Sequence, residues 1–163
     1  MKAMILLGCP EAPAQTPLAV YASYKLNQMG YETTIVSNPA AGKLLDVCDP
    51  EHVYIKNRED IDRTLEDLEE GDYDLLLGLV HKDAAATFFV TYYHILQTKA
   101  IALIFSRDGA EVEEFVDMVA SSTDAEIVAA KAYHNPTPIR VKLDKALKNF
   151  EIEEEAIHFE IEE

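Results

Sequence analysis

Residues 75–96, LLLGLVHKDAAATFFVTYYHIL, join an apolar run to a helical pattern through the charged triplet His81-Lys82-Asp83. The run from Tyr73 to Val80 is typical of a strand that is covered on both faces of a parallel sheet. The segment after the triplet predicts a helix from Ala84 to about Gln97, with Asp83 as its N-cap. The stretch therefore predicts a strand–turn–helix unit of an α/β fold.

The same alternation of apolar runs and helical patterns continues in both directions along the chain. Further strands are expected at residues 2–8, 32–36, 52–56, 100–105 and 125–132, and further helices at about 17–29, 37–49, 58–70, 109–122 and 137–149. Strands separated by helices form right-handed crossovers and a mostly parallel sheet. We predict a single α/β domain over residues 1–163, a three-layer α/β/α sandwich with a doubly wound, Rossmann-like sheet of six to seven strands.

The last residues of the chain, 151–163, are strongly acidic. They hold 7 of the 30 Asp and Glu residues and no Lys or Arg. Ile157, Phe159 and Ile161 alternate with polar residues, as they would in a strand. The segment is therefore expected to form an antiparallel edge strand or a solvated tail.

Composition excludes two classes of partner. With a formal net charge of −16, the chain has no basic stripe to replace counterions on phosphates, so nucleic acid is not an expected partner. No apolar run reaches the roughly 20 residues that span a bilayer, so a membrane is not expected either. Cys9 and Cys48 occur without an export signal, which predicts reduced thiols in a cytoplasmic protein, with Cys48 as a small core residue.

Ligands of doubly wound sheets bind beyond the carboxyl ends of the strands, where the strand order reverses. A strand order of 3-2-1-4-5 would place this crevice between the first and fourth strands, with residues 8–16 beside residues 81–87. Helix N-termini and Lys82 would favour a small anionic ligand there. The residues expected to bind it are Gly8, Glu11, Thr16, Asp83, Thr87 and Ser106, with Thr16 as the N-cap of the first helix. No Gly-rich phosphate motif follows the first strand, so no conventional nucleotide site is predicted and no cofactor is named.

A second hypothesis places thiol chemistry in the same crevice. Cys9 would act as nucleophile or metal ligand, His81 as general base and Lys82 as electrostatic stabiliser. A helix N-terminus and a nearby histidine favour a thiolate, and Cys, His and carboxylate groups also suit zinc or iron. No spaced ligand motif supports a metal centre, so none is predicted. The alternative, that the triplet is only a polar turn, stays open.

The helix expected over residues 84–97 carries Phe88, Phe89, Tyr92 and Tyr93 around much of its circumference. Such a helix is buried on more than one side. Core packing combined with a homodimer interface would explain the pattern, as would an aromatic ligand pocket. We expect a homodimer.

Two segments, ILLGCPEAPAQTPLAVYASYKLNQMGYETTIVSNPAA (5–41) and YDLLLGLVHKDAAATFFVTYY (73–93), resemble an uncharacterised domain family that occurs in methanogenic archaea. The resemblance covers almost the whole chain through the Gly8-Cys9-Pro10-Glu11 loop and the His81-Lys82-Asp83 junction. It implies a single Rossmann-like domain in an archaeal cytoplasm and carries no activity. The function expected is that of a homo-oligomeric binding or accessory protein for a small anionic ligand or a protein partner, and the alternative is the thiol enzyme.

Overall fold

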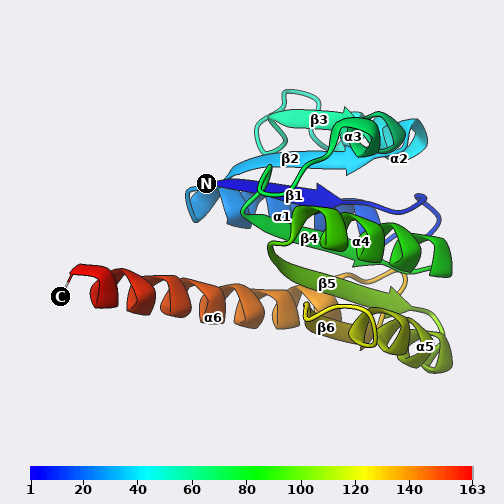
Figure 1. The fold of residues 1–163 in the computed structure, drawn as a ribbon. Coiled ribbons are helices and arrows are strands. Elements are labelled where there is room, and N and C mark those ends of the chain that lie inside the picture. The colour runs from blue at the N-terminus through cyan, green and yellow to red at the C-terminus, as the bar shows by residue number, and fades with distance from the viewer. Residues whose placement is uncertain (163) are drawn as a thin grey trace.

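The computed structural model describes residues 1–162 and contains six parallel strands in the order β3-β2-β1-β4-β5-β6 (Figure 1). The strands are β1 (Lys2–Leu6), β2 (Glu32–Ser37), β3 (Asn57–Asp60), β4 (Leu75–Val80), β5 (Lys99–Ser106) and β6 (Glu126–Lys131). The helices are α1 (Gln15–Gln28), α2 (Pro39–Cys48), α3 (Ile61–Asp67), α4 (Asp83–Leu96), α5 (Gly109–Ala120) and α6 (Thr137–Glu162). The predicted doubly wound, Rossmann-like α/β sheet is confirmed.

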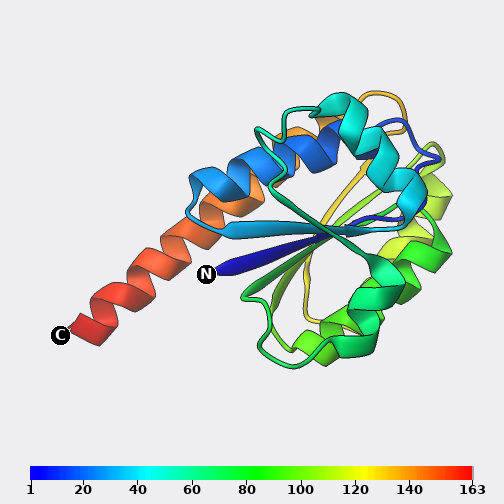
Figure 2. The same cartoon turned by 90° about the horizontal axis from the view of Figure 1, so that it is seen from above.

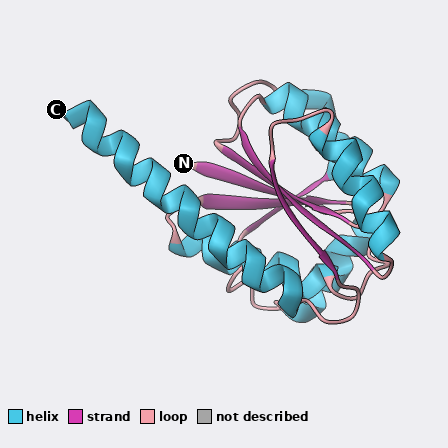
Figure 3. Cartoon of the chain, turned by 90° about the horizontal axis from the view of Figure 1, so that it is seen from below, coloured by secondary structure: helices cyan, strands magenta, loops and turns pink. Residues whose placement is uncertain are grey.

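The helices form two layers, one on each face of the sheet (Figure 2, Figure 3). α1, α2 and α6 cover one face, and α3, α4 and α5 cover the other. Alternate residues of β1 follow this division, because Ala3 and Ile5 pack with α1 whereas Met4 and Leu6 pack with α4. All residues of β4 are buried, which explains its continuous apolar sequence.

Close packing joins β4 to α4 at Gly78. A Cβ atom at this position would lie 2.2 Å from Cδ2 of Phe89, so a glycine is needed to leave room for the ring. Phe89 and Tyr92 are fully buried, and the core role predicted for them is confirmed. Phe88 and Tyr93 are half-buried against the same cluster. Among the described residues, no helix is both long enough and apolar enough to cross a membrane.

The third strand lies later in the chain than the sequence predicted, because residues 52–56 form a loop. The carboxylate of Asp49 accepts hydrogen bonds from the backbone N–H groups of residues 53, 54 and 55 at 2.9, 3.0 and 2.8 Å. Three donors that a sheet would use are therefore occupied by a side chain. Pairing with β2 begins only at Asn57, and the helix predicted over residues 58–70 is shortened to α3.

The C-terminal segment is a helix. α6 continues to Glu162, so the predicted helix end at residue 149 and the predicted edge strand or tail are wrong; residue 163 lies outside the described residues. No Gly or Pro after Pro138 stops the helix, and its many glutamates are good helix formers. Ile157 and Ile161 have the i, i+4 spacing of one helix face, so their alternation with polar residues was misleading.

Cys48 is exposed, which corrects its prediction as a core residue. Within α2 only Ala41 and Leu45 are buried. Cys48 is the last residue of the helix, where the chain turns into the 49–56 loop, and it borders a surface hollow together with Tyr24 and Tyr54.

Candidate active crevice between β1 and β4

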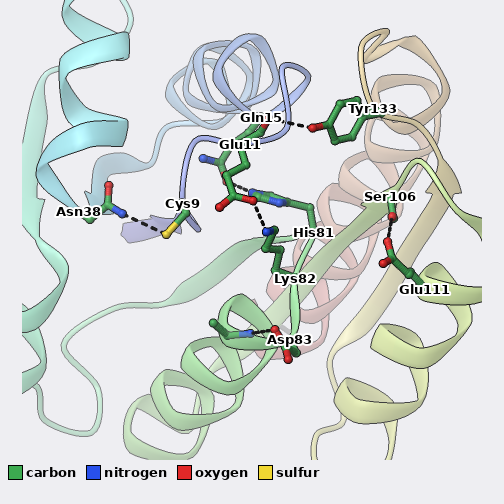
Figure 4. A network of polar contacts seen from close by, with 11 residues as sticks. Cys9, Glu11, Gln15, Asn38, His81, Lys82, Asp83, Ser106, Glu111 and Tyr133 are labelled. Carbon is green, nitrogen blue, oxygen red and sulfur yellow. Dashed lines mark hydrogen bonds and ion pairs between the residues drawn. The ribbon is translucent and has the colours of Figure 1, made fainter.

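The reversal of strand order places the candidate site at the carboxyl ends of β1 and β4 (Figure 4). These strands pair in parallel, with Ile5 opposite Leu77. The chain leaves β1 for α1 on one face of the sheet and leaves β4 for α4 on the other face. The first turns of both helices therefore flank the same crevice, as expected for this fold.

Gln15, the first residue of α1, is the fully buried centre of the crevice. Its Nε2 donates to the Gly8 carbonyl at 2.9 Å, and its Oε1 accepts from the Gly8 N–H at 3.0 Å. Because Gly8 offers one donor and one acceptor, these two bonds assign the oxygen and the nitrogen of the Gln15 side-chain amide. Oε1 also lies 3.1 Å from Nε2 of His81. One side chain thus connects the ends of β1 and β4.

His81 acts as a neutral hydrogen-bond donor in this network. Because Oε1 of Gln15 can only accept, Nε2 of His81 carries the hydrogen. Burial lowers the pKa of His81 below 6.5, although the backbone of Cys9 and the charge of Glu11 act in the opposite direction. The imidazole packs on Phe105, with ring centroids 5.5 Å apart. The imidazole is therefore uncharged at neutral pH, and Nδ1 is its basic nitrogen.

An ion pair between Lys82 and Glu11 closes the outer side of the crevice. The two side chains are 49% and 54% exposed. The hydrogen bond from Lys82 lowers the pKa of the Glu11 carboxyl, and the same contact raises the pKa of Lys82. Lys82 thus carries a positive charge at the mouth of the crevice, and a carboxylate from the β1–α1 loop balances it.

Tyr133, which follows β6, holds the β1–α1 loop from the far side of the sheet. The Ala14 N–H donates to the Tyr133 carbonyl at 2.8 Å, and the Tyr133 hydroxyl donates to the Glu11 carbonyl at 3.1 Å. The Arg107 guanidinium lies 4.1 Å from the centre of the Tyr133 ring. The loop therefore reaches across the carboxyl ends of β4 and β5, which accounts for the burial of His81.

Cys9 lies at the rim of the crevice and is exposed. Figure 4 shows its sulfur pointing toward Asn38, whose Nδ2 donates to it at 3.5 Å. The Asn38 amide has a defined orientation, because its Oδ1 caps α2 by accepting from the Ala41 N–H at 2.8 Å. The predicted nucleophile and the predicted base, His81, therefore each have a different partner.

Two predicted helix caps are wrong, Thr16 by two residues and Asp83 by one. α1 begins at Gln15 with Ala14 in the N-cap position, so Thr16 lies inside the helix. The hydrogen bond from Ala14 to Tyr133 and the pairing of Gln15 with Gly8 fix the chain before Thr16 is reached. Asp83 is the first residue of α4, and its Oδ1 accepts from the N–H of the next residue.

The remaining predicted ligand-binding residues have partners within the protein. Thr87 donates to the Asp83 carbonyl inside α4 at 3.1 Å. Ser106, the last residue of β5, is buried and donates at 2.5 Å to the carboxylate of Glu111 in the first turn of α5. Within residues 1–162, no three His, Cys, Asp or Glu side chains are grouped to hold a metal ion.

The structure therefore assembles Gly8, Glu11, His81 and Lys82 of the predicted residues into one cluster. It adds Gln15 and Tyr133, which the sequence analysis did not identify. The available signal was weak, since Gln15 stands directly before the marked helix start and Tyr133 directly after the sixth apolar run.

A protein-family model described as a domain of unknown function, DUF1890, matches residues 4–146. The chain belongs to the DUF1890 family. The uncharacterized protein MJ0452 of Methanocaldococcus jannaschii is 32% identical to this DUF1890 chain over 151 residues, which are 91% of this chain and 99% of that protein. The predicted resemblance to an uncharacterised family of methanogenic archaea is confirmed.

Solved structures agree with this DUF1890 fold. The structure of MT0777 has a TM-score of 0.88 at 46% sequence identity and covers 90% of this chain and 97% of that chain. The crystal structure of the cypemycin decarboxylase CypD has a TM-score of 0.56 at 10% identity and covers 91% of this chain and 93% of that chain. The likeness to CypD concerns the fold alone.

Proposed function

We propose that this DUF1890 domain binds a small anionic molecule at the carboxyl ends of β1 and β4, where Lys82 pairs with its carboxylate or phosphate. The observation that carries the proposal is the Lys82–Glu11 ion pair across the crevice. A loop carboxylate occupies the position that the acidic group of a ligand would take. The bound molecule replaces Glu11 on Lys82.

Replacement of Glu11 costs little free energy. Both side chains are about half exposed, so solvent screens the ion pair and it contributes little to stability. Lys82 also stands directly before the first turn of α4, where unpaired helix amides carry a partial positive charge. A ligand carboxylate or phosphate would therefore interact with both the Lys82 ammonium and the N-terminus of α4, whereas Glu11 pairs with Lys82 alone.

The floor of the crevice supports recognition of a defined ligand. Gly8, Gln15 and His81 are linked by hydrogen bonds of 2.9 to 3.1 Å, so their polar groups are fixed before a ligand arrives. Preorganised polar groups reduce the ordering cost of binding.

Calorimetric titration with inorganic phosphate and with malonate tests the proposal on three charge variants. Lys82→Gln should weaken binding about fivefold, as expected for loss of one charge contact that solvent screens. Glu11→Gln should strengthen binding, because it removes the competing carboxylate. Lys145→Gln, an exposed lysine on α6, is the matched control and should leave affinity unchanged. The proposal fails if neither anion binds wild-type protein, or if Lys82→Gln and Glu11→Gln shift affinity in the same direction.

Thiol chemistry at Cys9 is the second candidate, and the orientation of Asn38 favours it. The Asn38 amide lies 3.5 Å from the exposed sulfur and holds a hydrogen-bond donor against the atom that would attack an electrophile or bind a metal. His81 is less suited to act as its base, since Nε2 is engaged by Gln15. A base for this chemistry would have to come from Nδ1 of His81 or from the substrate.

A further inference from the structure

Two apolar surfaces of the chain are exposed, and the first is the terminal segment of α6, residues 151–162. The buried face of α6 is made by Ile139, Leu143, Leu147 and Phe150, and helical periodicity continues this face to Ile157 and Ile161. The sheet ends before these two residues, and Figure 1 and Figure 2 show the last turns of α6 projecting beyond it.

The terminal segment exposes large apolar side chains on two sides. Ile157 and Ile161 are 49% and 76% exposed, and Ile152 and Phe159 on the opposite side are 57% and 75% exposed. An isolated helix of this length is marginal in water. Near the start of the segment, the Tyr31 hydroxyl donates a hydrogen bond to Glu154 at 2.7 Å and so connects it to the rest of the domain. The exposed isoleucines and phenylalanine lack a covering surface within the described chain.

The second surface is the α1–α2 groove, a hollow of about 390 Å³. It is lined by Pro17, Val20, Tyr21, Tyr24, Cys48 and Tyr54. The rings of Tyr24 and Tyr54 meet edge to face at 5.8 Å and form its wall. Exposed Leu44 and Val47 of α2 and Val53 of the following loop extend the apolar area beside it. Contiguous exposed apolar surface of this kind is typical of an interaction site.

Charge is divided unevenly between the two surfaces. Residues 1–58, which contain the whole α1–α2 groove, have five Lys or Arg and five Asp or Glu, so their formal net charge is zero. The entire formal charge of −16 lies in residues 59–163, and the terminal segment holds six glutamates without a Lys or Arg. The part of the chain that supplies the groove residues is thus formally neutral, and it repels the acidic terminal segment less than the rest of the chain does.

We propose that the terminal segment of one chain docks in the α1–α2 groove of a second copy, and that the exchange is reciprocal. Within one chain the terminal segment points away from α2 in both Figure 1 and Figure 2, so its own groove is out of reach. Direct pairing of two terminal segments would bring six glutamates of each helix together. Reciprocal docking avoids this repulsion and closes the assembly as a two-fold dimer.

Analytical ultracentrifugation of the full chain tests this arrangement, with far-UV circular dichroism to verify folding. Wild-type protein should form a dimer. The helix variant Ile157→Glu/Ile161→Glu and the groove variant Tyr24→Glu/Tyr54→Glu change exposed side chains, and each should raise the dimer dissociation constant at least about tenfold. Lys145→Gln/Lys148→Gln, on the exposed side of α6, serves as the control and should remain dimeric. A mixture of the helix and groove variants should recover dimer, because one of its two contacts is intact.

Cys48 gives an independent readout in wild-type protein, since it lines the groove and Cys9 lies elsewhere. Raising the protein concentration should slow alkylation of Cys48 and leave that of Cys9 unchanged. A monomer at every accessible concentration would overturn the proposal. A dimer that is lost in the helix variant and kept in the groove variant would also overturn it, because the terminal segments would then pair with each other. A dimer that is kept in both variants would overturn it as well, because the chains would then associate through another face, such as α4. These results do not depend on anion binding at Lys82.

Discussion

Replacement of Gln15 by methionine should destabilise the domain strongly. Methionine has a similar length, so the change removes the amide with little change in packing volume. Three polar groups then lose their partner: the N–H and the carbonyl of Gly8, and the Nε2–H of His81. His81 is 6% exposed and cannot turn its donor to water, whereas Gly8 is half-buried.

The expected cost follows from this difference in burial. An unpaired buried polar group costs about 1–3 kcal/mol, so His81 contributes about 2 kcal/mol and the two half-buried groups of Gly8 about 1 kcal/mol each. The free energy of unfolding should therefore fall by about 4 kcal/mol. Domains of this kind are stable by about 5–15 kcal/mol in total, so the loss is large.

Urea unfolding followed by far-UV circular dichroism measures this change, since the chain has no tryptophan. Gln28→Met is the matched control, because Gln28 is the exposed last residue of the same helix and should change stability by less than about 0.5 kcal/mol. An unchanged slope of the free energy of unfolding against urea concentration would show that variant and wild-type protein expose the same surface on unfolding. A loss below about 1 kcal/mol for Gln15→Met would refute the reasoning, since a single buried unpaired donor already costs that much.

Two further measurements address His81 and Cys9. The folded-state pKa of His81 lies below 6.5, so its contribution to stability is complete above pH 6.5 and is lost as the pH falls through the folded-state value. The free energy of unfolding of wild-type protein should therefore be lower at pH 5.5 than at pH 7, and the difference should be smaller in His81→Gln. Equal differences in the two proteins would exclude His81 as the cause. Asn38→Asp retains the oxygen that caps α2 and removes the amide donor to the Cys9 sulfur. It should slow alkylation of Cys9 by iodoacetamide about threefold or more at low protein concentration, with Cys48 as internal reference, and an unchanged rate ratio would dismiss a role for Asn38.

The central strands were predictable because burial on both faces leaves a continuous apolar sequence. β4 and β5 show this directly, with every residue of β4 and all but the first of β5 buried. The edge strand β3 was not predictable in the same way. Its residues, Asn57–Asp60, are polar and mostly exposed, whereas the apolar residues just before them give their backbone donors to Asp49. A side chain that competes with a neighbouring strand for backbone N–H groups leaves no periodic pattern in the sequence.

The sequence predicted where the candidate site lies better than it predicted which residues form it. Strand order alone brings the β1–α1 loop to His81 and Lys82, and general fold rules supply that order. Gln15 was missed because its role depends on a partner, His81, that is 66 residues away in sequence. The direction of the Cys9 sulfur was also inaccessible, since it depends on how Asn38 caps α2.

Tyr133 connects the crevice to the last helix of the chain. It follows β6 and shortly precedes α6, and its hydroxyl and carbonyl hold Glu11 and Ala14 in the β1–α1 loop. The short connection between Tyr133 and α6 therefore links the start of α6 to Glu11, the residue that pairs with Lys82. The crevice of this domain is mechanically tied to the helix that projects farthest from it.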